Sequence, residues 1–312
     1  MDGSWFRSIR TQTLLWIERP GQTISAGLKD KSFDRHKKLF VMEGQITFMN
    51  HTMWKIVRGE GPLIATAIHN GHELRDDVAA ITALSDGARL REEDPYTGKW
   101  AEVVETNIVV ERSRFEVDLN RPRDKAFYQS PEDAWGLNLW KEPPGPNIIQ
   151  RSLKQYDTFY DEVNQLLREK IAIHGFFLVL DIHSYNHLRE GPDGPIANPE
   201  SNPEVNVGTG TMDRTRWAPL VDRFISELNA FTFLDRNLDV RENAKFRGGE
   251  FPRWIHTNFP ENGCSLAVEF KKFFMNEWNG ELDQEMHKTI MQALRATLPG
   301  LSEELRRSGG HF

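Results

Sequence analysis

Two histidines, His69 and His183, each stand at the end of a short apolar run, at residues 62–68 and 176–182. Runs of this length that are apolar on both faces are typical of buried strands in a parallel sheet. Ligands of open α/β sheets collect outside the carboxyl ends of the strands, so the two imidazoles should meet at one edge. One histidine alone would more often be structural, but two at equivalent strand ends predict a metal site.

The remaining ligand should be a carboxylate, because a catalytic zinc usually has three protein ligands and one open position. The acidic run at residues 92–94 offers three carboxylates. We favour Asp94, with Glu93 as the alternative, because Pro95 holds the adjoining backbone in a fixed, extended form. Asp181 lies two residues before His183 and shares its face of the strand, where it could orient the imidazole ring.

His72 and Glu73 are rival ligands, since they follow His69 by three and four residues. Their alternative role is to begin a helix, whose N-terminus would favour the negative charge of Glu73.

Arginine side chains cluster on the segment that follows. Arg112 and Arg114 are two residues apart on an expected extended segment and would share one face, and the pair Asn120-Arg121 comes next. Guanidinium groups bind carboxylates through two parallel hydrogen bonds. In a site that hydrolyses an amide, one arginine would anchor a substrate carboxylate and another would polarise the carbonyl group. The alternative is a salt-bridged edge strand.

Glu269 stands among apolar neighbours in residues 264–270. Burial raises the pKa of a carboxyl group toward the range that suits a general base. The alternative is a buried ion pair with Lys271 or an arginine.

Strands and helices alternate along the chain, which predicts a three-layer α/β fold with a mixed, mostly parallel sheet and helices on both faces. The pattern predicts a long functional loop at 130–147, and Gly175 as the C-terminal cap of the helix that follows this loop. The expected strands are 62–68, 105–110, 114–119, 176–182, 204–207 and 264–270, and the expected helices are 74–84, 148–173, 215–230 and 281–296.

Composition narrows the class of protein. The 312-residue chain has a net charge of −7, which argues against a nucleic-acid groove, and it has no apolar run long enough to cross a membrane. Its single cysteine, Cys264, fits a reducing cytoplasm and leaves histidine and carboxylate as metal ligands. The sequence does not indicate an oligomeric state.

Residues 1–52 differ from the rest, with eight Lys/Arg against five acids, a net of +3, and no sustained period. We interpret them as a peripheral N-terminal extension, or as residues before the true start, since Met49 and Met53 lie just before the organised part. Residues 53–312 are expected to form a single domain.

Several motifs occur in an order that resembles the N-formylglutamate amidohydrolase family, over about residues 54–280. That family is in turn similar to zinc carboxypeptidases and aspartoacylases. The motifs are His69-Asn70-Gly71, Glu92-Glu93-Asp94-Pro95-Tyr96-Thr97, Asp118-Leu119-Asn120-Arg121-Pro122, Asp181-Ile182-His183-Ser184, Gly208-Thr209, Gly248-Gly249 and Val268-Glu269-Phe270.

The resemblance implies a phosphorylase/hydrolase-like fold and a zinc-dependent amidohydrolase that splits N-formyl-L-glutamate into formate and glutamate. It implies that Glu269 activates water and that Arg114 stabilises the oxyanion. The implied ligands of Zn²⁺, or of another divalent transition metal, are His69, Asp94 (or Glu93) and His183, and the implied contacts to the substrate carboxylate are Asn120 and Arg121.

Two other functions remain open. A carboxypeptidase-like enzyme or another N-acyl-amino-acid deacylase would act on larger substrates, and the loop at 130–147 would distinguish them. A non-catalytic metal- or amino-acid-binding protein is disfavoured, because Glu269 accompanies all three ligands.

Overall fold

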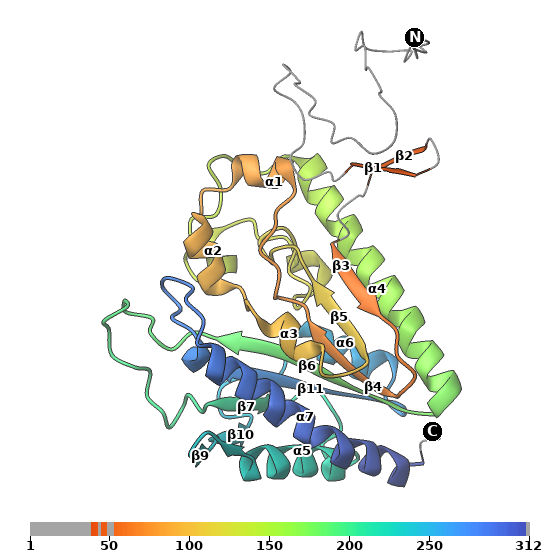
Figure 1. The fold of residues 1–312 in the computed structure, drawn as a ribbon. Helices are drawn as coiled ribbons and strands as arrows, with labels where there is room; N and C mark the ends of the chain where they lie inside the picture. Colours follow the sequence, from red (N-terminus) through yellow and green to blue (C-terminus); the bar gives the residue numbers. More distant parts are fainter. Residues whose placement is uncertain (1–38, 43–44, 49–52, 310–312) are drawn as a thin grey trace, which may run out of the picture. The chain divides into compact units, whose positions relative to one another are not determined.

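The computed structural model describes residues 39–42, 45–48 and 53–309 (Figure 1). Contacts divide the chain into two units, Met1–His51 and Thr52–Phe312. In the first unit, β1 (Leu39–Met42) pairs with β2 (Gln45–Phe48) in antiparallel orientation. Most of the predicted extension at 1–52 lies outside the described residues.

The second unit contains a seven-stranded sheet in the order β10-β7-β11-β6-β4-β5-β3. Four of its strand pairings are parallel, whereas β7–β11 and β5–β3 are antiparallel. The predicted mixed, mostly parallel sheet is therefore confirmed. Its strands are β3 (Trp54–Val57), β4 (Leu63–Ala67), β5 (Thr106–Val110), β6 (Phe177–Tyr185), β7 (Val205–Gly208), β10 (Val240–Glu242) and β11 (Gly263–Lys271).

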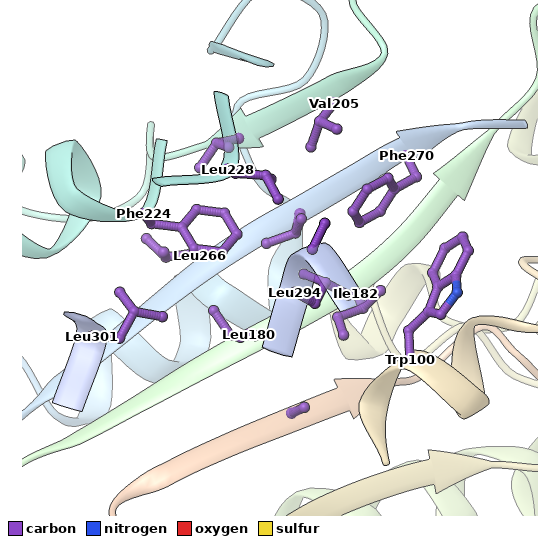
Figure 2. Close-up of a cluster of buried hydrophobic side chains, with 14 of the residues drawn as sticks. Trp100, Leu180, Ile182, Val205, Phe224, Leu228, Leu266, Phe270, Leu294 and Leu301 are labelled. Carbon is purple, nitrogen blue, oxygen red and sulfur yellow. The ribbon is translucent and has the colours of Figure 1, made fainter. Parts of the chain in front are cut away.

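Helices cover both faces of this sheet, as predicted. One apolar cluster joins one face to α4 (Pro146–His174) and α6 (Glu250–Asn258). A second cluster joins the other face to α3 (Thr97–Ala101), α5 (Ala218–Ala230) and α7 (Gln284–Arg307). Figure 2 shows this second cluster, in which Trp100 lies beside Phe270 at one end and Phe224 lies beside Leu266 at the other. Burying each such side chain contributes roughly 1.5–3 kcal/mol.

The central strands β4, β6 and β11 are covered on both faces of the sheet, so the residues at their ends are held in fixed positions. Every residue of β4 and of β6 is buried. Gly175 caps α4 with φ of 79°, as predicted, and the chain then enters β6 directly. The carboxyl ends of β4, β6 and β11 therefore lie side by side at one edge of a rigid sheet.

The predicted strand at 114–119 is wrong. This segment is a series of turns, and its neighbour Arg112 makes only an isolated bridge with Glu73. Residues 115–119 are all buried: Phe115, Val117 and Leu119 reach the apolar clusters from a loop, and the two acidic side chains between them are buried in ion pairs with Arg112 and Arg114.

The helix predicted at 74–84 is shorter, because the bridge keeps Glu73 extended and α1 (Asp76–Ile81) begins after it. The sequence reading also missed α2 (Asp86–Glu92), α3 and α6, and it ended α7 too early, at residue 296.

The connections contain short elements: three 3₁₀ turns at Arg123–Lys125, Pro131–Ala134 and Lys272–Phe274, and the pair β8 (Thr232–Phe233) and β9 (Arg236–Asn237). Among the described helices, none is both long and apolar enough to span a bilayer.

Candidate active site

A buried cluster of two imidazoles and one carboxylate lies at the edge of the sheet. His69 follows β4, His183 lies near the end of β6, and Asp94 lies between α2 and α3. These three side chains offer ligand atoms within 4.8 Å of one another, and each side chain is at most 4% exposed. The structure thus brings together the three residues that the sequence suggested as metal ligands.

Each imidazole is oriented by a second carboxylate. His69 Nε2 donates to Asp118 Oδ1 at 2.7 Å, and His183 Nε2 donates to Asp181 Oδ2 at 2.9 Å. Nδ1 of each ring therefore faces Asp94, at 3.5 Å for His69 and 3.0 Å for His183. Fixing one nitrogen as a donor leaves the other available as a ligand, which is the usual arrangement of metal-binding histidines.

Electrostatics couple the cluster tightly. Burial alone would raise the pKa of Asp94, but hydrogen bonds from His183 and His69 lower that pKa below its ordinary range. Burial disfavours the charged form of His183, yet Asp181 and Glu269 raise the pKa of His183 well above its usual value. The concentrated negative charge therefore favours a cation among these residues.

Glu93, the alternative ligand, is turned away from the two histidines. It accepts a hydrogen bond from His72 Nδ1 at 2.5 Å and another from the hydroxyl of Ser113. His72 is thereby paired with Glu93 and lies outside the cluster. The backbone of Glu73 forms an isolated β-bridge with that of Arg112. Geometry thus favours Asp94 over Glu93, His72 and Glu73.

Asp118 is the site residue that the sequence reading did not single out. It is fully buried, and it accepts hydrogen bonds from His69, from Arg114 Nη2 at 2.7 Å, from the backbone N–H of Asn120 at 2.8 Å and from the hydroxyl of Tyr128. Burial opposes its charge, but Arg114 and His69 hold the pKa of Asp118 well below its usual value. Its place two residues before Asn120 in a recognised motif was the available signal.

The two arginines expected to share a face are engaged separately. Arg112 donates to Glu116 at 3.2 Å, whereas Arg114 donates to Asp118 and lines the cavity described below. The Arg114 guanidinium also lies over the ring of Trp135, 4.9 Å from its centroid. Only Arg114 of this pair therefore reaches the site.

Asn120 and Arg121 both line the cavity described below. Asn120 Oδ1 accepts from the backbone N–H of Phe251 at 2.9 Å in the first turn of α6, so its Nδ2 is left as a donor. Arg121 donates to the carbonyl of Asp133 at 3.1 Å, and about a third of its side chain is exposed.

Glu269 lies on β11 directly beside His183 in the sheet register. Burial raises the pKa of Glu269 to about 7, with His183 opposing this and Asp94 adding to it. No ion pair joins it to Lys271, whose ammonium donates to the carbonyl of Asn202 at 2.8 Å. A carboxylate tuned near neutral pH can accept and return a proton.

One cavity of about 270 Å³ joins these groups. Its lining includes the favoured ligands, the expected base and the expected substrate contacts, but not the alternative ligands Glu93, His72 and Glu73: His69, Asp94, His183, Glu269, Arg114, Asn120 and Arg121. A buried site able to hold a cation, beside a carboxylate and guanidinium groups, can carry out metal-assisted hydrolysis. The remaining lining residues are Glu92, Trp135, Ser184, Tyr185, Asn186, Arg189, Phe246, Arg247, Gly248, Gly249 and Lys272.

The model of the N-formylglutamate amidohydrolase family matches residues 61–274. The chain therefore belongs to this family, and its membership supports an amide-hydrolysing enzyme with a small-molecule substrate. A search of the curated proteins found no match.

Solved structures agree on the fold. An N-formylglutamate amidohydrolase from Ralstonia eutropha JMP134 is 19% identical, with a TM-score of 0.64 over 82% of this chain and 99% of its own. A gene product of Agrobacterium tumefaciens is 16% identical, with a TM-score of 0.56 over 80% of this chain and 95% of its own. A metallo-carboxypeptidase from Burkholderia cenocepacia also matches at 14% identity, over 78% of this chain and 56% of its own, but its TM-score of 0.31 is too low to support an argument.

Proposed function

We propose that residues 53–312 form a metal-dependent amidohydrolase domain that hydrolyses the amide of an N-acyl amino acid, with N-formyl-L-glutamate as the leading substrate. The observation that carries this proposal is the presence of Glu269 in one cavity with the His69–Asp94–His183 cluster. The family of the chain supports the same reaction.

The cluster fits a divalent cation in its chemistry. Two imidazoles and a carboxylate are the donor set of many catalytic zinc sites, and both rings are already oriented by carboxylates. We therefore propose Zn²⁺ as the ion, held by His69, Asp94 and His183. When bound, it would supply Lewis acidity at the acyl carbonyl and lower the pKa of water.

The side chains around the cluster divide the remaining work. Glu269 takes the proton of the attacking water and later returns it to the leaving amine. Arg114 donates to the oxygen on which negative charge develops. Asn120 Nδ2 and the partly exposed Arg121 bind the substrate carboxylate, since both residues line the cavity and carry N–H donors.

The size of the cavity favours a small substrate over a peptide. At about 270 Å³ it falls below the ~300–1,000 Å³ typical of pockets for drug-sized ligands. Trp135, from the loop at 130–147, lines this cavity beside Arg114. An N-acyl amino acid therefore suits the site better than the longer substrates of a carboxypeptidase.

The test is formate release from N-formyl-L-glutamate by the wild-type protein and by Glu269→Gln, with and without a chelator, alongside metal content by mass spectrometry. Glu269→Gln should keep its metal and lose about 10²–10⁴ in turnover, because the proton acceptor is removed. Glu242→Gln is the control, since Glu242 pairs with Arg214 outside the cavity. Turnover like that of the wild type in Glu269→Gln would remove Glu269 from the reaction.

A further inference from the structure

Asn186 carries a buried side-chain amide that has no hydrogen-bond partner in the described part of the chain. Its side-chain amide forms no hydrogen bond with the described residues, Oδ1 is buried without a partner, and the residue is only 5% exposed. It lines the cavity that holds Glu269 and the ligand cluster. Leaving a buried acceptor unsatisfied is destabilising, so such groups in native proteins usually have a partner or a role in binding.

The backbone around Asn186 is rigid. Asn186 is the first residue after β6, and the next two backbone N–H groups, of His187 and Leu188, donate to the buried carboxylate of Glu277 at 2.8 and 2.6 Å. The indole N–H of Trp278 donates to the carbonyl of Leu188 at 2.8 Å. The backbone that carries Asn186 is therefore held in place beforehand, which lowers the entropy lost when its side chain binds a ligand.

The three carboxylates that line the cavity already have roles or partners. Asp94 belongs to the ligand cluster and Glu269 is the proposed base. Glu92 accepts from Arg91 Nε at 3.1 Å. Of the two side-chain amide oxygens that line the cavity, Asn120 Oδ1 accepts from the N–H of Phe251, so Asn186 Oδ1 is the one without a partner among the described residues.

N-formyl-L-glutamate carries a single N–H donor, that of the amide to be cleaved, because its two carboxylates and its formyl oxygen only accept. We propose that Asn186 binds the substrate by accepting a hydrogen bond from this N–H. The bond would fix the plane of the amide relative to Glu269, and it would make the enzyme prefer amides over esters of the same shape. This inference rests on the proposed function, since it requires an N-acyl amino acid as substrate.

The experiment compares two substrates that differ only at this N–H: N-formyl-L-glutamate and the formate ester of (S)-2-hydroxyglutarate. Values of kcat/KM are measured as formate release, corrected for spontaneous ester hydrolysis. Asn186→Leu should lower kcat/KM for the amide by about 10- to 100-fold and for the ester by less than about threefold. Asn186→Asp keeps an oxygen acceptor, so its amide-to-ester ratio should stay within about threefold of the wild-type ratio.

Tyr185→Phe is the matched control. Tyr185 lines the same cavity, but its hydroxyl donates to the carbonyl of Pro203, so any loss should be equal for amide and ester. If Asn186→Leu does not fold, Asn186→Ala replaces it, and the same changes in kcat/KM for amide and ester are expected.

An equal loss on both substrates, or no loss on the amide, would overturn the role of Asn186 while leaving the proposed function intact. A wild-type protein that releases formate from neither substrate would overturn the proposed function itself.

Discussion

Asp118 joins two parts of the site, and replacing it with asparagine should weaken both. The carboxylate accepts from His69 Nε2 and from Asn120 N–H through Oδ1, and from Arg114 and Tyr128 through Oδ2. In Asp118→Asn, the side-chain amide would have one oxygen for these four donors. Its NH₂ group must therefore face either Arg114 and Tyr128 or His69, and in each case a donor meets a donor.

The expected magnitude follows from these contacts. If the NH₂ group faces His69, the ring must carry its proton on Nδ1, the nitrogen that faces Asp94, and cannot ligate through it. Losing such an orienting partner typically weakens metal binding about 10- to 100-fold, or about 1.4–2.7 kcal/mol. If it faces Arg114, that guanidinium loses its buried ion pair, and turnover should fall by about 10²–10³ because the oxyanion partner is displaced.

Asp181→Asn separates these two effects. Asp181 accepts from His183 Nε2 at 2.9 Å and from the hydroxyl of Thr66 at 2.7 Å, with no arginine attached. Both variants should bind metal more weakly in competition with a chromogenic chelator. At saturating metal, Asp181→Asn should recover most of its kcat, whereas Asp118→Asn should not. Full recovery of kcat in both variants would refute the link through Arg114.

Three further predictions test separate parts of the structure. Glu93→Gln should keep its metal affinity within about threefold, while Asp94→Asn should lower it more than about tenfold in the same competition assay, because only Asp94 faces the histidines. Gly249→Ala should raise KM with little change in metal content, since a Cβ there would lie 2.3 Å from Asn120 Oδ1 and displace that side chain; an unchanged KM would contradict this role. Burial lowers the pKa of His256 to about 4, below its value of ~6.5 in an unfolded chain. The contribution of the neutral ring to the free energy of unfolding is therefore complete above about pH 6.5, and roughly 3 kcal/mol of it is lost as the pH falls to about 4. The free energy of unfolding, measured with urea, should therefore depend less steeply on pH in His256→Gln than in the wild type.

The geometry of the cluster was accessible from the sequence because it depends on strand ends. His69 and His183 follow apolar runs that can be buried on both faces only as central strands. Because these two strands are parallel neighbours, their carboxyl ends lie at the same edge of the sheet. Asp181 was assigned by the two-residue period of a strand and Glu269 by its apolar neighbours, and the structure confirms their positions on β6 and β11.

The choice between Asp94 and Glu93 as the metal ligand depends on side-chain contacts that only the folded structure shows. Both side chains are buried, and a turn between two short helices has no period from which to tell which one faces His69. The structure separates them because Glu93 is satisfied by His72 and Ser113, contacts that join parts of the chain about twenty residues apart. The segment after Arg112 was wrongly predicted as a strand because its apolar residues alternate with charged ones in the sequence, whereas Glu116 and Asp118 are themselves buried in ion pairs.

Several motif residues support the site through backbone contact rather than chemistry. A Cβ on Gly71 would lie 2.2 Å from the carbonyl carbon of Glu111, so the chain after His69 can pass this backbone only as glycine. Asn70 Oδ1 accepts from the N–H of Gly98 at 2.9 Å and so fixes α3, which follows Asp94. The motif that begins with His69 therefore positions two metal-ligand candidates at once: it delivers the imidazole, and it holds the helix that anchors the carboxylate.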